Sequence, residues 1–150
     1  MRKETNHMRK ITRQSALAFL DSELRYNRHF TVANTTVCGV DTTGRGMFLH
    51  GHLIAHRAGI VSPREWNLDS AIYLTLAGRN TRTTRDRLNG ILELMDKPWR
   101  FVQQGHSPYL LDTRKGTGSK ISHWEQIEAR TGQITNGNLE TEQVFGFRLL

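Results

Sequence analysis

The sequence predicts an α+β fold made of a small, mostly antiparallel sheet, an N-terminal helix and one central basic helix. Apolar residues recur at helical spacing over residues 12–27 and again over residues 82–95. Between and after these segments, short runs that favour strands alternate with turn residues. Because a chain of 150 residues with 37% hydrophobic side chains can bury one modest core, we expect residues 11–150 to form a single domain.

The N-terminal part is predicted to contain a basic arm followed by the first helix. Residues 1–10 carry several cations and no apolar run, so we expect a mobile arm. The helix over residues 12–27 follows from leucines at helical spacing, Leu17, Leu20 and Leu24. Thr12 or Ser15 is a suitable N-cap residue for it.

Three strands are expected next. Residues 30–40 are rich in valine and threonine, residues 41–46 have turn chemistry, and residues 47–57 form the returning strand. A polar loop follows, and alternating apolar residues predict a third strand over 71–76.

The central helix is predicted over residues 82–95 from a stripe with the spacing i, i+3, i+4 and i+7, which is Leu88, Ile91, Leu92 and Met95. Thr81 or Thr83 can cap it, and Asp86, three residues after Thr83, resembles a capping box. Pro98 ends the helix.

The C-terminal part is predicted to be mostly strands and loops, with the segment 113–142 flexible. In chain order we expect a hairpin over 99–104 and 109–112, a basic glycine-rich loop over 113–120, a short helix over 123–130, a turn at 136–137 and a strand over 144–150.

Composition favours an acidic partner. Lysine and arginine number 21 against 14 acidic residues, which gives a formal net charge of +7. Nucleic acid is the first partner that such a balance indicates, and an acidic protein is the second. No apolar run approaches the ~20 residues of a membrane span, so no membrane partner is expected. Cys38 is the only cysteine, which excludes an internal disulfide and a zinc site built from several thiolates.

The most informative segment is the start of the central helix, which is crowded with arginine and threonine. Free backbone N–H groups and the positive end of the helix dipole make such a position favourable for phosphate. The alternative is a well-capped surface helix with solvated arginines. A helix-turn-helix with Gly78 in its turn is disfavoured, because residues 72–76 alternate like a strand. The candidate anion-binding residues are Arg79, Thr81, Arg82, Thr83, Arg85, Arg87 and Asn89.

Further cations are candidates for auxiliary contacts with a nucleic-acid backbone. They are Arg114, Lys115 and Lys120. Residues 116–120 lack the spacing of a phosphate-binding loop, so a flexible basic loop is the preferred interpretation.

Three histidines between residues 49 and 57 form a second candidate site. In one continuous strand, His50, His52 and His56 would share a face. His50 and His52 are weak candidates for metal ligands, and the three together are an alternative catalytic group. Half-buried histidines without metal are the commoner outcome, so we expect no metal and no cofactor.

Residues 77–89 read Ala-Gly-Arg-Asn-Thr-Arg-Thr-Thr-Arg-Asp-Arg-Leu-Asn. This segment resembles a family of small uncharacterised proteins of tailed bacteriophages, which carry Gly-Trp-x-Thr-x-Thr-Thr-Lys/Arg-x-Arg-Met/Leu-Asn between two strands. Arg79 stands where that family has tryptophan. The resemblance covers about residues 34–112. It implies a phage origin and a strand–helix–strand core, and it implies no activity.

Together these features favour a small basic phage protein that binds nucleic acid without catalysis, in the cytoplasm of the host cell. One alternative is an inhibitor or modulator that docks the same basic face on a host protein, such as a defence or transcription component. A second alternative is a histidine- or metal-dependent enzyme that processes a phosphate compound.

Overall fold

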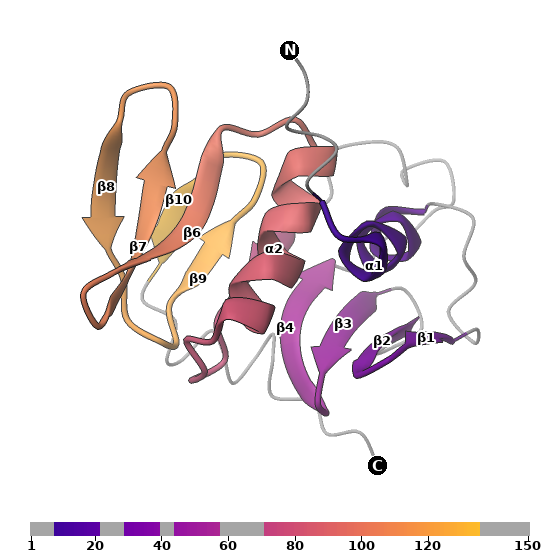
Figure 1. Cartoon of the computed structure of the whole chain (residues 1–150). Helices are drawn as coiled ribbons and strands as arrows, with labels where there is room; N and C mark the ends of the chain where they lie inside the picture. Colours follow the sequence, from indigo (N-terminus) through magenta and orange to yellow (C-terminus); the bar gives the residue numbers. More distant parts are fainter. Residues whose placement is uncertain (1–7, 22–28, 40–43, 58–70, 136–150) are drawn as a thin grey trace.

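In a computed structural model, the described part of the chain forms two helices and two antiparallel sheets, which confirms the predicted α+β fold (Figure 1). The structure describes residues 8–21, 29–39, 44–57 and 71–135. Its elements are α1 (Lys10–Leu20), β1 (Phe30–Val32), β2 (Thr35–Gly39), β3 (Arg45–Leu49), β4 (His52–Arg57), β5 (Ile72–Leu74), α2 (Arg82–Leu94), β6 (Trp99–Gln104), β7 (Ser107–Asp112), β8 (Thr117–Lys120), β9 (Gln126–Glu128) and β10 (Gln133–Thr135).

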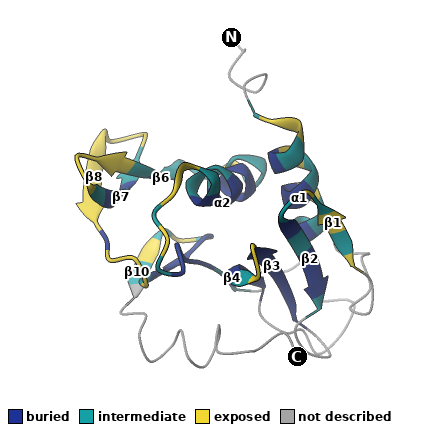
Figure 2. Cartoon of the chain, turned by 60° about the horizontal axis from the view of Figure 1, so that its bottom comes forward, coloured by how far each residue is buried: buried dark blue, intermediate teal, exposed yellow. Residues whose placement is uncertain are grey.

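The larger sheet has the order β1-β2-β3-β4-β5-β9-β10, and the smaller has the order β6-β7-β8. Helix α1 packs on β1, β2 and β3, while α2 lies against α1, β4 and β6. Figure 1 shows α2 running between strands β1 to β4 of the larger sheet on one side and the smaller sheet, with β9 and β10, on the other. One apolar cluster draws residues from both helices and both sheets, so α2 is buried along its apolar stripe (Figure 2). Neither helix in the described ranges has the length and apolar character needed to cross a membrane.

Helix α1 begins two residues earlier than predicted and buries a different face. Thr12 and Ser15 lie inside the helix and are buried, and neither caps it. The core side of α1 is lined by small residues and one aromatic, Phe19, whereas Leu17 is 50% exposed. The leucine spacing was therefore a misleading guide to the buried face. Small residues face the core because α2 packs close: a Cβ on Gly90 would lie 2.3 Å from Cγ2 of Thr12.

Two long predicted strands are in fact hairpins. The segment 30–40 divides into β1 and β2 around Ala33 and Asn34, and Ala33 has φ 55°. The segment 47–57 divides into β3 and β4 around His50 and Gly51, with φ values of 53° and 82°. Both φ values are positive, as in a two-residue type I′ turn, which favours glycine at such positions. The feature of the sequence that could have predicted this turn is the glycine directly after His50.

Strand β5 and helix α2 confirm the predicted strand–helix order. Thr81 is the N-cap, and its hydroxyl accepts a hydrogen bond of 3.1 Å from the backbone N–H of Thr84. The predicted capping box of Thr83 with Asp86 is wrong. Asp86 instead accepts a hydrogen bond from the hydroxyl of Thr12 in the neighbouring helix.

The smaller sheet contains the predicted hairpin, which is formed by β6 and β7. The segments that follow this hairpin differ from the prediction. Residues 113–116 form a turn, and the second half of the expected loop is strand β8. The predicted helix over 123–130 is wrong, because residues 126–128 form β9 between β5 and β10. All three residues of β9 are buried, so pairing inside the large sheet outweighs local helical preference.

Some predictions fall on parts of the chain outside the described residues. They concern most of the N-terminal arm, the end of the first helix, part of the turn over 41–46, the turn at 136–137 and the strand over 144–150.

Candidate anion-binding site

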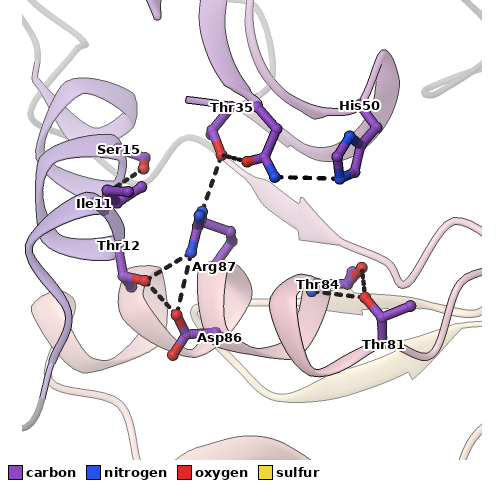
Figure 3. A network of polar contacts seen from close by, with 10 residues as sticks. Ile11, Thr12, Ser15, Thr35, His50, Thr81, Thr84, Asp86 and Arg87 are labelled. Carbon is purple, nitrogen blue, oxygen red and sulfur yellow. Dashed lines mark hydrogen bonds and ion pairs between the residues drawn. The ribbon is translucent and has the colours of Figure 1, made fainter. Parts of the chain in front are cut away.

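A pocket of about 190 Å³ joins the two motifs that the sequence presented separately. On one side lie Arg79, Thr81 and Thr83, at the beginning of α2. On the other side lie His50 and His52, at the turn between β3 and β4. Leu49, Ile54, Leu76 and Thr84 complete the lining. Figure 3 shows His50 at the turn between β3 and β4, and Thr81 and Thr84 in the first turn of α2.

The N-terminal side of the pocket is built by a tight turn after β5. Ala77 and Gly78 both have positive φ, and the backbone N–H of Arg79 donates to the carbonyl of Leu76 at 2.9 Å. Two features of the structure require glycine at position 78. Its φ is +80°, and a Cβ there would lie 2.5 Å from Cζ2 of Trp124. This turn places Arg79 beside the start of the helix.

The hydroxyls of Thr81 and Thr84 lie 2.8 Å apart, and together they hold the first turn of α2. Thr81 satisfies one of the free N–H groups of that turn, and the remaining ones keep the partial positive charge of the helix end. Thr84 is buried, whereas Thr81 and Arg82 are exposed. The exposed part of the motif is thus the part next to the pocket.

The histidines do not share one face as predicted. The pairing of β3 with β4 shifts between Met47 and Phe48, and the shift leaves Ile54 as an extra residue in β4. The bulge reverses the alternation, so His52 lies on the side of α2 and His56 on the other side of the sheet, in the row of Cys38 and Tyr73. His56 is buried and does not line the pocket.

Several motif residues hold the fold together. Arg85 donates to Oδ1 of Asn80 at 2.5 Å and to Oε1 of Gln103 at 2.9 Å. The side chain of Asn89 donates to the carbonyl of Phe101 at 2.9 Å and accepts from its N–H at 2.7 Å. Asn89 therefore satisfies the free edge of β6 and attaches α2 to the smaller sheet.

Arg87 lies in the interior, at 3% exposure, and does not belong to the surface formed by Arg79 and Arg82. Its Nε donates to the hydroxyl of Thr35 at 2.9 Å, and its NH1 donates to the hydroxyl of Thr12 at 3.0 Å (Figure 3). The carboxylate of Asp86 lies 3.2 Å from the same NH1. Burial lowers the pKa of Arg87, and the charge of Asp86 opposes that shift. Arg87 thus joins α1, α2 and β2.

The auxiliary cations divide between the two ends of α2. Arg114 and Lys115 lie in the turn between β7 and β8, level with the start of β6 and away from the pocket. Arg114 pairs with Asp112 at 3.4 Å, and its guanidinium carbon is 5.8 Å from the centre of the Trp99 ring. Lys120 is exposed at the other end of β8, which pairs with the part of β7 nearer the pocket.

The pocket has the chemistry of an anion site. None of the nine described residues that line it carries a carboxylate, while it contains a guanidinium, two imidazoles and three hydroxyls. Its volume is below the ~300 Å³ at which pockets for whole small molecules begin, so one phosphate-sized group fits better than a complete cofactor. The described residues contain no group of three or more histidine, cysteine or acidic side chains placed to hold a metal.

A wider pocket of about 550 Å³ lies over α1, where Leu17, Leu20 and Phe30 make it largely apolar. It contains Asp21 and no cation among its described lining residues. Residues 22–28, which follow Asp21 in the chain, lie outside the described residues. The smaller pocket is therefore the better candidate site.

Sequence reasoning missed that the two motifs meet, and it missed Asn34 and Thr35. Asn34 contacts the ring of His50, and Thr35 contacts Arg87. The available signal was the pair Ala33-Asn34, whose turn preference would have divided the predicted strand.

Residues 8–136 match the family model described as Kyanoviridae Gp96 protein. The match spans most of the chain and extends beyond the region 34–112 in which the phage resemblance was found. It supports the predicted phage origin but does not test the individual arginine–threonine motif. No curated protein matches the chain, and no solved structure matches it either.

Proposed function

The chain belongs to the Kyanoviridae Gp96 protein family, and we propose that this phage protein binds the phosphate backbone of nucleic acid in the cytoplasm of the host cell, without catalysis. One observation supports the proposal above all: Arg79, the start of α2 and two histidines converge on a pocket whose described lining residues carry no carboxylate. Backbone phosphates are the commonest macromolecular anions that such a donor-rich pocket would meet.

The proposal depends on those residues of the motif that are exposed near the pocket. Arg79 and Arg82 are exposed at the pocket end of α2, and Thr81 and Thr83 add hydroxyls. Arg85 can contribute charge, although its guanidinium is already bound to Asn80 and Gln103. Arg87 and Asn89 stabilise the fold and are omitted from the proposed surface.

The experiment is a titration of labelled oligonucleotides, single- and double-stranded, at several salt concentrations. Arg79→Ala with Arg82→Ala removes two cations beside the pocket, and Arg114→Ala with Lys115→Ala removes two at the far end of α2. We expect the first pair to weaken binding and to reduce the slope of log K against log[salt] by about 1.8 for a duplex. The second pair is the matched control, because it changes the net charge by the same amount.

Equal weakening by both pairs would contradict the proposed location, because net charge alone would then explain the affinity. A pull-down from host lysate, with and without nuclease, tests the alternative partner. If one host protein survives nuclease treatment while no oligonucleotide binds, the basic face serves a protein-directed modulator and the proposal is wrong.

The enzyme alternative is weakened by the bulge in β4, which separates His56 from the other two histidines. Phosphatase and nuclease assays with His52→Ala as control test it directly. Turnover that this variant abolishes would replace binding by catalysis as the proposed function.

A further inference from the structure

A chain of hydrogen bonds connects the buried Arg87, which pairs with the half-buried Asp86, to the ring of His50 at the pocket. Arg87 donates to Thr35 at 2.9 Å, and the hydroxyl of Thr35 donates to Oδ1 of Asn34 at 3.1 Å. The amide nitrogen of Asn34 lies 3.2 Å from Nε2 of His50. Figure 3 shows this chain running from α2 through β2 to the turn between β3 and β4.

The atoms that meet at each link of the chain assign its direction. A guanidinium can only donate, so the oxygen of Thr35 accepts from Arg87. Thr35 has a single hydroxyl proton, which goes to the carbonyl oxygen of Asn34. Because that carbonyl is thereby fixed, the NH₂ group of Asn34 faces His50, and an amide NH₂ can only donate.

We infer that this network fixes His50, which lines the pocket, in the tautomer protonated at Nδ1, so that the ring nitrogen not engaged by Asn34 is an N–H donor. Nε2 must accept from Asn34, and a neutral imidazole then carries its proton on Nδ1. Asn34 and Thr35 are accordingly positioning residues, while His50 is the residue that contacts the ligand. The role in binding rests on the proposed function, in which the ligand is a phosphate.

The same geometry makes His50 a poor metal ligand. Its Nε2 lone pair is engaged by Asn34, and its Nδ1 holds a proton, so neither nitrogen has a lone pair free for a cation. The network thus selects anions over metals at a histidine pair whose spacing alone is compatible with either.

The origin of the directionality lies far from the pocket. The hydroxyl of Thr12 accepts from Arg87 at 3.0 Å and donates to Asp86 at 2.5 Å. The carboxylate of Asp86 accepts the hydrogen bond from Thr12 and lies against Arg87. On its other side, Arg87 donates to the hydroxyl of Thr35. An ion pair between two adjacent residues of α2, Asp86 and Arg87, therefore sets the proton on a surface imidazole.

The test is nitrogen NMR of the His50 ring in the full chain, at a pH where histidines are neutral. In the unaltered protein we expect Nδ1 to resonate as a protonated nitrogen and Nε2 as an unprotonated one. An isolated histidine ring in water favours the opposite tautomer, so this result is not the default. A predominantly Nε2-protonated ring in the unaltered protein would overturn the inference.

Asn34→Asp changes the shape of the side chain little but reverses the direction of its hydrogen bond with His50. A carboxylate accepts from Thr35 and also from His50, so we expect the proton of the ring to move to Nε2. Thr35→Val removes the hydroxyl without adding charge, and we expect a mixture of tautomers, with Thr35→Ser restoring the original form. If Asn34→Asp leaves the tautomer unchanged, the network does not control His50 and the inference fails. Asn34→Asp lies in a turn, so it remains informative if Thr35→Val folds poorly.

Inorganic phosphate serves as the probe that separates this inference from the proposed function. We expect phosphate to shift the resonances of Arg79 and His50, and to bind several-fold more weakly to Thr35→Val than to Thr35→Ser. If phosphate causes no shift although the tautomers respond as expected, the anion pocket is wrong and the control of His50 by the network stands.

Discussion

Two groups of arginines in this protein have opposite surroundings. Arg45 and Arg57 are cross-strand partners on β3 and β4, both buried, and they donate to carbonyl oxygens at the C-terminal end of α1. Arg79 and Arg82 are exposed at the N-terminal end of α2. The first pair meets the negative end of a helix dipole, and the second pair adds to the positive end. Buried arginines therefore complete the fold, and exposed ones leave positive charge for a ligand.

The interior pair pays an electrostatic cost that the surface pair avoids. Burial, and then the neighbouring charge of Arg57, lowers the pKa of Arg45 to about 10, while Asp21 opposes the shift. The NH1 group of Arg45 donates to the carbonyls of Ala18, Phe19 and Asp21. These contacts give donors to carbonyls at the end of α1, where the backbone N–H groups of a continuing helix are missing.

The largest expected effect is the loss of the interior arginine. Arg45→Met should lower the free energy of unfolding by about 3 kcal/mol, because the last carbonyls of α1 lose one of their two arginine donors in a buried site. Urea denaturation followed by circular dichroism measures it. Arg82→Met is the matched control on the surface and should change stability by less than ~0.5 kcal/mol. Equal costs for the two substitutions would contradict the contrast between the groups.

The next effect concerns the contact of α1 with α2, which encloses Arg87. Gly90→Ala should cost about 2 kcal/mol, because its Cβ would lie 2.3 Å from Cγ2 of Thr12. Thr12→Ser removes that methyl group and keeps the hydroxyl that bridges Arg87 and Asp86. In the Thr12→Ser background Gly90→Ala should therefore be tolerated. An unchanged cost in the double variant would show that another contact limits the approach of the helices.

A smaller, pH-dependent effect is expected at Glu128 in β9. Burial raises the pKa of its carboxyl, but hydrogen bonds from the N–H of Ile72 and from Arg130 outweigh it and hold the pKa below the ordinary value. The carboxylate thus stabilises the fold above the ordinary pKa, and the contribution is lost as pH falls through the lowered one. The cost of Glu128→Gln, measured by urea denaturation between about pH 6 and pH 3, should shrink as pH falls. A cost independent of pH would exclude this linkage.

The smallest expected effect on stability belongs to the pocket itself. Arg79→Ala with Arg82→Ala should leave the urea midpoint nearly unchanged, since both side chains are exposed. The same variant should lose affinity for oligonucleotides. A marked loss of stability would mean that these arginines hold the fold, as Arg45 does, and would remove them from the proposed surface.

The sequence by itself determined α2 and most of its buried stripe, and it limited the cap to Thr81 or Thr83. Periodicity, the capping threonine and the proline that follows all act within a few residues, so they are legible without the rest of the chain. It also determined the basic charge and the antiparallel hairpin of β6 and β7. The sequence also contained the residues of the two-residue turns in the other two hairpins. The long runs of strand-favouring residues around them led us to predict one continuous strand in each segment.

Only the tertiary structure decided which motif residues face solvent. Arg87 contacts Thr35, 52 positions away, and the bulge in β4 reverses the side on which His56 lies. β9 is a strand because it pairs with both β5 and β10 in the larger sheet. Such outcomes depend on contacts between distant parts of the chain, and local propensity is too weak to fix them. The same contacts united an arginine turn and a histidine turn into one pocket.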